Sequence, residues 1–152
     1  MKTPWTIGGR RLLLVLALMW PGVGLCGDYV LITLNDAMPA ISESKAKMLY
    51  LGKLRSIEAF GKVELVDWPE GSLEKQTFYK SFLNKSIPQI NSRRARMAFS
   101  GKGQPPDAIR EASSEAILQW LSDHPRGIAY VDRQQVPQGA RIILDIEQGV
   151  GR

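Results

Sequence analysis

The chain has one cysteine and one histidine among its 152 residues, Cys26 and His124. A single cysteine excludes a disulfide framework, and a lone histidine offers neither a paired metal site nor a partner for a nucleophile. We therefore expect no enzyme, no metal and no cofactor, and we interpret His124, in the stretch His124-Pro125-Arg126-Gly127, as a turn residue. The chain also lacks internal repeats, low-complexity tracts and an interdomain linker, which favours one domain.

Long apolar runs are scarce, and one of the few lies near the N-terminus. Lys2, Arg10 and Arg11 precede the run Leu12–Trp20, which Pro21-Gly22 ends. The run is too short for a membrane span, which needs about 20 residues. Its charge pattern is that of an export signal.

Small residues follow the run, as a cleavage site requires. Gly24 and Cys26 occupy the two small-residue positions of a signal peptidase site, so we predict a signal peptide at 1–26 and a periplasmic location. The cysteine then leaves with the signal. Lipidation of Cys26 and an uncleaved anchor are the rival fates, and Leu25 is a poor fit to lipidation because that position favours a small residue.

In the rest of the chain, basic and acidic residues nearly balance. Without the three basic residues of the signal, the 20 lysines and arginines fall to 17, against 15 aspartates and glutamates. This balance gives no reason to expect a nucleic-acid partner. Removal of 26 of the 152 residues leaves 126, enough for one domain with a core. We expect that domain over 27–147 and a frayed tail at 148–152.

Strand-like and helix-like segments alternate along this domain. The nearly continuous apolar run Tyr29–Leu34 is typical of a strand covered on both faces. Serines precede the periodic segments and predict helix starts. The predicted strands are 29–34, 63–66, 128–131 and 141–146, and the predicted helices run from Ser42 to about Leu51, from Ser72 to Leu83, from Ser86 to about Phe99, and from Ser113 or Ser114 to His124. This order indicates an α/β fold with a mixed, mostly parallel sheet flanked by helices.

The stretch Val63–Ser72 is the centre of this arrangement. It predicts a strand, a turn at Pro69 and Gly71, and a helix that begins at Ser72, with Leu73, Phe78, Phe82 and Leu83 near one face. Such a junction points free N–H groups at one spot and can hold an anion. Ser72 could equally be an ordinary helix cap, and Glu74 already complements the helix dipole.

Other polar residues are candidates for the same ligand. Ligands gather at the carboxyl ends of strands in such sheets, where we place Asn35, Gly71 and Ser72. Lys102, in the glycine-rich loop 100–106, would contribute charge, although the spacing is not that of a nucleotide-binding loop. The arginines at 93, 94 and 96 could grip an oxyanion, but we interpret them as a solvated helix face.

Four short motifs carry a resemblance to a known family. They are Leu49-Tyr50-Leu51-Gly52-Lys53, Glu70-Gly71-Ser72, the stretch from Phe99 to Pro106, and Gly127-Ile128-Ala129-Tyr130-Val131-Asp132, in the family's order and across nearly all of the mature chain. With them the chain resembles the small periplasmic proteins related to phosphate-binding components of ABC transporters, which have the type 2 periplasmic-binding-protein fold.

The resemblance implies an exported solute-binding protein that grips phosphate or a similar small oxyanion, with Gly71 and Ser72 matching the family's anion-binding turn. A membrane transporter would be its partner. An alternative function stays open, because 126 residues hold about one lobe of the full-size, two-lobed relatives. In that alternative the chain is a periplasmic interaction or sensory module with the same fold and no tight ligand of its own.

Overall fold

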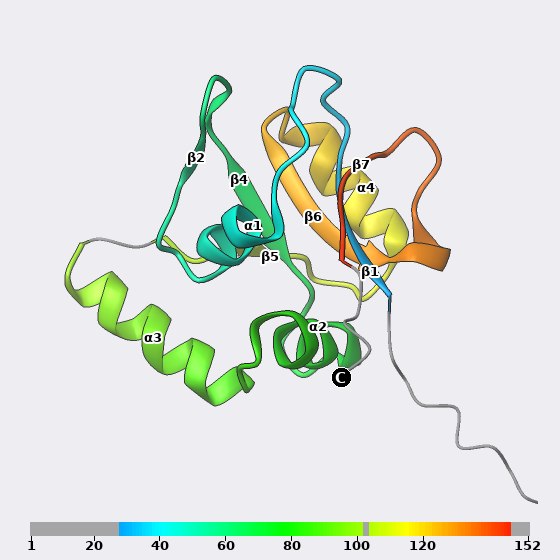
Figure 1. Ribbon diagram of the computed structural model, residues 1–152. Coiled ribbons are helices and arrows are strands. Elements are labelled where there is room, and N and C mark those ends of the chain that lie inside the picture. The colour runs from blue at the N-terminus through cyan, green and yellow to red at the C-terminus, as the bar shows by residue number, and fades with distance from the viewer. Residues whose placement is uncertain (1–27, 102–103, 147–152) are drawn as a thin grey trace, which may run out of the picture.

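The computed structural model describes residues 28–101 and 104–146 (Figure 1). The predicted signal peptide, Lys102 and the tail at 148–152 lie outside these residues. The elements follow one another as β1 (Tyr29–Thr33), α1 (Glu43–Tyr50), β2 (Ser56–Ile57), β3 (Gly61–Lys62), β4 (Glu64–Asp67), α2 (Leu73–Leu83), α3 (Ile87–Phe99), β5 (Asp107–Ala108), α4 (Ser114–Asp123), β6 (Gly127–Asp132), a 3₁₀ turn (Arg133–Gln135) and β7 (Arg141–Asp145).

The main sheet has five strands in the order β5-β4-β6-β1-β7, and β2 and β3 form a separate hairpin. Strand β4 pairs in parallel with both β5 and β6, whereas β1 is antiparallel to β6 and β7. Because β7 opposes β1, it runs in the direction of β6, and β1 alone runs against the other four. The predicted mixed, mostly parallel α/β sheet is therefore confirmed.

Both faces of the sheet are covered. All five residues of β1 are buried, as its continuous apolar sequence predicts. In β6 the side chains alternate between faces: Tyr130 packs against Phe78 of α2 and Tyr50 of α1, while Gly127 lies against Trp120 of α4. Figure 1 shows α4 lying along β6, α2 at the end of the sheet where β4 ends, and α3 projecting away from the sheet.

Serine caps begin the helices where the sequence predicts them. The hydroxyl oxygens of Ser42, Ser72 and Ser113 each accept a hydrogen bond from the backbone N–H three residues later. Ser86 and Gln89 form a capping box at the start of α3. The helix starts are thus fixed by local side-chain chemistry.

Two features of the fold differ from the sequence prediction. Leu73 is 58% exposed rather than part of the apolar face of α2, because it lies five residues before Phe78 and so about 140° around the helix from it. Strand β5 has only two residues, both exposed, and carries no apolar run that would reveal it. Among the described residues, no helix has the length and apolarity needed to cross a membrane.

Candidate functional site

The turn between β4 and α2 is held from below by a buried tryptophan. Trp68 is buried, and its Nε1 donates a hydrogen bond to the carbonyl oxygen of Tyr130 at 2.8 Å. Three residues later Gly71 has φ +83°, a left-handed conformation that favours glycine. The Ser72 N–H closes the turn onto the carbonyl oxygen of Pro69 at 3.1 Å. The turn therefore has a fixed base and an exposed tip.

Ser72 caps α2, so the capping interpretation is confirmed. Its Oγ accepts from the N–H of Lys75 at 3.4 Å, and the side chain of Gln76 donates to the carbonyl oxygen of Gly71 at 3.1 Å. Within the described part of the chain, the N–H groups of Leu73 and Glu74 have no acceptor, as expected in the first turn of a helix. These two N–H groups and the Ser72 hydroxyl proton are free to meet an anion.

Directly beneath the turn, the carboxylate of Asp67 is buried and bound from four sides. The hydroxyl of Tyr79 donates to its oxygens at 2.9 and 3.0 Å, and the hydroxyl of Tyr130 donates at 2.9 Å. Arg94 Nη1 lies 3.0 Å and Lys75 Nζ 3.5 Å from its Oδ2. A buried charge needs such partners, and this one joins β4, β6, α2 and α3.

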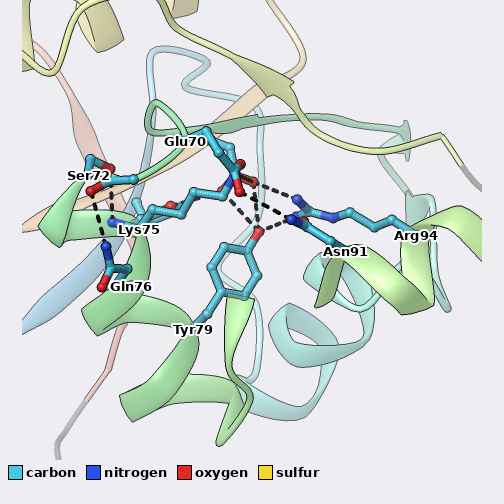
Figure 2. A network of polar contacts seen from close by, with 10 residues as sticks. Glu70, Ser72, Lys75, Gln76, Tyr79, Asn91 and Arg94 are labelled. Atoms are coloured by element: carbon cyan, nitrogen blue, oxygen red, sulfur yellow. Dashed lines mark hydrogen bonds and ion pairs between the residues drawn. The ribbon is translucent and has the colours of Figure 1, made fainter. Parts of the chain in front are cut away.

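A second carboxylate, that of Glu70, reaches one of these cations, Lys75, from the surface (Figure 2). Glu70 Oε2 accepts from Lys75 Nζ at 2.7 Å, and its Oε1 accepts from Asn91 Nδ2 at 3.1 Å. These hydrogen bonds lower the pKa of Glu70 below its ordinary value, and the one from Lys75 has a larger effect than the one from Asn91. Two cations, Lys75 and Arg94, are therefore balanced by two carboxylates, Asp67 and Glu70.

Three buried tyrosines surround this network. Burial is the largest cause that raises the pKa of Tyr50, Tyr79 and Tyr130 well above the ordinary value, and the negative charge of the nearby Asp67 carboxylate is the second. The Tyr50 hydroxyl and the Arg94 Nε are buried without a partner among the described residues. Both residues line a cavity of about 20 Å³, which is room for one water molecule to join them.

The prediction of a solvated arginine face on α3 is wrong for Arg94. Its side chain is only 17% exposed, and it contacts Asp67 and the hydroxyl of Tyr79. Burial lowers the pKa of Arg94, but its electrostatic and hydrogen-bond interactions with Tyr79 and Asp67 outweigh this and raise it. Arg93 lies partly buried with its Nε 2.9 Å from the carbonyl oxygen of Leu51, and Arg96 is exposed. No local sequence signal distinguishes these three arginines, because their partners lie on other elements.

The structure does not bring the predicted site residues together. Gly71 and Ser72 follow the carboxyl end of β4, whereas Asn35 follows the carboxyl end of the antiparallel β1 and so lies at the opposite edge of the sheet. There its Nδ2 donates to the carbonyl oxygen of Pro125 at 2.7 Å and its Oδ1 accepts from the N–H of Ala37 at 2.9 Å. Lys102 lies outside the described residues.

A larger cavity lies away from the turn. It has a volume of about 190 Å³ and is found between the end of α1, the β2–β3 hairpin, β4 and the segment after residue 103. Its lining includes Leu49, Arg55, Lys62, Glu64, Pro106 and Asp107. The side chains of opposite charge in this lining give no net preference for an anion. Across residues 28–101 and 104–146, no group of three or more histidines, cysteines, aspartates or glutamates could hold a metal ion.

Comparison with known proteins supports the fold. No family model and no curated protein matches the chain. Among solved structures, an ABC-type phosphate transport receptor from Vibrio cholerae superimposes with a TM-score of 0.57 at 9% identity, over 77% of this chain and 45% of the receptor. PstS from Borrelia burgdorferi gives 0.57 at 13% identity, over 77% and 46%.

A third structure, of a phosphate ABC transporter substrate-binding protein with bound phosphate, comes from Clostridium perfringens. It superimposes with a TM-score of 0.55 at 16% identity, over 77% of this chain and 44% of the Clostridium perfringens protein. The chain therefore shares its fold with part of each of these proteins, and the expected resemblance to phosphate-binding components of ABC transporters is confirmed at the level of fold. It spans less than half the length of each of these receptors.

Proposed function

We propose that the chain is an exported solute-binding protein that captures a small oxyanion, with phosphate as the candidate, at the start of α2 and passes it to an ABC-type transporter. One observation carries the proposal. At the exposed turn after β4, the free N–H groups of Leu73 and Glu74 and the hydroxyl of Ser72 point out from a helix start. Two of the similar structures, the phosphate transport receptor from Vibrio cholerae and the phosphate-bound protein from Clostridium perfringens, favour this class of ligand.

The expected affinity is modest. The turn is open to solvent, so water competes with the anion for each donor and weakens the electrostatic gain. The cations beneath the turn, Lys75 and Arg94, already have carboxylate partners. We therefore expect a dissociation constant of about 1 mM, which corresponds to about 4 kcal/mol.

Calorimetric titration of the purified protein with inorganic phosphate tests the proposal. Ser72→Ala removes the hydroxyl and should abolish the heat of binding. Ser42→Ala is the matched control, because it removes the equivalent cap of α1, where Ser42 Oγ accepts from the N–H of Lys45 at 3.3 Å. Equal binding by the wild type and both variants, or no heat from the wild type at about 10 mM phosphate, would contradict the proposed site.

A second candidate function is an interaction or sensory module with the same fold and no tight ligand. It is favoured by the neutral network beneath the turn and by the chain's length, less than half that of the similar receptors. The exposed Arg96 on the projecting helix α3 offers a contact for an acidic partner. This function predicts no heat with phosphate, and a cross-linked partner protein in the expressing cell that is lost on Arg96→Glu.

A further inference from the structure

We propose that Lys75 Nζ and Asn91 Nδ2 form an anion-binding pair that Glu70 fills in this structure, and that an external oxyanion such as phosphate binds there when the Glu70 side chain leaves. The inference deepens the proposed function and rests on it, since the pair lies beside the start of α2. It assigns Glu70 as an internal competitor that sets the affinity of the site.

Lys75 is the first part of the argument. Its side chain is only 4% exposed, so its charge requires an anionic partner close by. Asp67 lies 3.5 Å from Lys75 Nζ and is already bound by Arg94 and two tyrosine hydroxyls. The closer partner is Glu70, at 2.7 Å. An anion therefore binds Lys75 Nζ from the surface, where Glu70 now lies.

Asn91 supplies a second donor from a different helix. Its Nδ2 donates to Glu70 Oε1, while Lys75 Nζ donates to Glu70 Oε2. Figure 2 shows the two side chains, one from α2 and the other from α3, converging on the same carboxylate. Each oxygen of the carboxylate thus has its own donor. Phosphate and other oxyanions present the same arrangement of two oxygens on one atom.

Glu70 is the group that can be displaced. Its side chain is 63% exposed, whereas Lys75 is fixed within the protein. An exposed carboxylate loses little when it moves into water, because water replaces its hydrogen bonds. It follows Pro69 and precedes Gly71 in the turn, so its departure moves no strand or helix. The donor pair stays in place, held by α2 and α3, and becomes available to a ligand.

The test compares two Glu70 variants of the full chain with the wild type by phosphate titration. Glu70→Gln removes the competing charge, and Glu70→Ala empties the donor pair. If Glu70 fills the pair about nine-tenths of the time, both variants should bind phosphate about tenfold more tightly than the wild type. Glu58→Gln is the control, because it removes an exposed carboxylate that pairs with Lys45 at 3.5 Å, away from the start of α2. It should change the affinity much less.

A double variant identifies the donor. Glu70→Ala combined with Asn91→Ala should lose most of the gain, while its melting temperature should stay close to that of Glu70→Ala because Asn91 is exposed. If the Glu70 variants bind no better than Glu58→Gln while the wild type binds through Ser72, the anion pair is refuted and the proposed function stands. If only the Glu70 variants bind, Glu70 closes the site in the wild type, and the proposed capture by the wild type fails. Absence of binding in every variant refutes both.

Discussion

At the scale of single residues, the buried carboxylate of Asp67 has the greatest influence on the structure. It is the common partner of Lys75, Arg94, Tyr79 and Tyr130, which come from three different elements. Asp67 lies in the central stretch Val63–Ser72, where the sequence predicts no role for it. The sequence around this aspartate does not reveal its partners, because the tyrosines and the arginine lie 12 to 63 residues away.

Replacement of Asp67 by asparagine should strongly destabilise the fold. Asp67→Asn keeps the shape but leaves Arg94 without its carboxylate and Lys75 with Glu70 alone, so we expect a loss of about 3 kcal/mol in the free energy of unfolding. Urea denaturation measures it. Glu58→Gln is the matched control, since Glu58 is exposed and pairs with Lys45 at 3.5 Å. A loss no larger than the control's would show that the network is not a stabilising element.

The tyrosines predict a steep loss of stability at alkaline pH. The four tyrosines of the chain are Tyr29, Tyr50, Tyr79 and Tyr130; burial raises the pKa of Tyr29 to about 12 and that of the other three well above their ordinary value. A raised pKa in the fold means that the unfolded chain releases its phenol protons first. Stability is therefore fully present below about pH 10 and falls as the pH rises further.

This behaviour is measured by following tyrosinate absorbance and circular dichroism together during an alkaline titration. The two signals should change in the same transition, because the phenols ionise when the chain unfolds. Tyrosinate absorbance that rises near pH 10 while the circular dichroism remains that of the folded protein would contradict the burial of the phenols.

At the scale of elements, helix starts were the most predictable part of the chain. Ser42, Ser72, Ser86 and Ser113 all cap the helices that they precede, because capping depends on residues within one turn of one another. Gly52, which follows the end of α1, has a left-handed conformation with φ +71°, and glycine at such a position is likewise predictable from nearby residues. Features that depend on distant partners, such as the two-residue β5 and the burial of Arg94, were not predictable in this way.

The cap of α2 has a measurable effect on stability. Ser72→Ala should lower the free energy of unfolding by about 1 kcal/mol, and Ser42→Ala by a similar amount, since each removes one hydroxyl that satisfies one helix N–H. Thermal unfolding of both variants measures the effect. A much larger loss for Ser72→Ala would indicate that Ser72 supports the network beneath the turn as well as the helix.

The residue before this cap should be sensitive for a different reason. Gly71 has φ +83° with open space around its Cα, so a methyl group would meet no clash there. Gly71→Ala should still cost about 1 kcal/mol, because a residue with a Cβ is strained in the left-handed region. Gly127→Ala offers the contrast: its φ is ordinary, but its Cβ would lie 2.8 Å from the carbonyl oxygen of His124. A stabilised Gly71→Ala would contradict the turn geometry.

At the scale of the whole molecule, the alternation of strands and helices was enough to predict the fold class, and four dispersed motifs were enough to predict the resemblance. The direction of β1 could not be predicted from the alternation, because parallel and antiparallel strands buried on both faces carry the same apolar run. This one reversal separates Asn35 from Gly71 and Ser72, which the sequence placed together at strand ends. The ligand roles of Asn35, Gly71, Ser72 and Lys102 stay predictions.

The central claim is that an oxyanion binds at the start of α2. A titration of the isotope-labelled protein with inorganic phosphate, followed by amide chemical shifts in NMR, tests it most directly. The largest shifts should fall on the amides of Leu73 and Glu74, while those of Asn35 and Ala37, at the opposite edge of the sheet, should stay unchanged. Shifts confined to the cavity beside Arg55 and Lys62, or none at all at about 10 mM phosphate, would contradict the account.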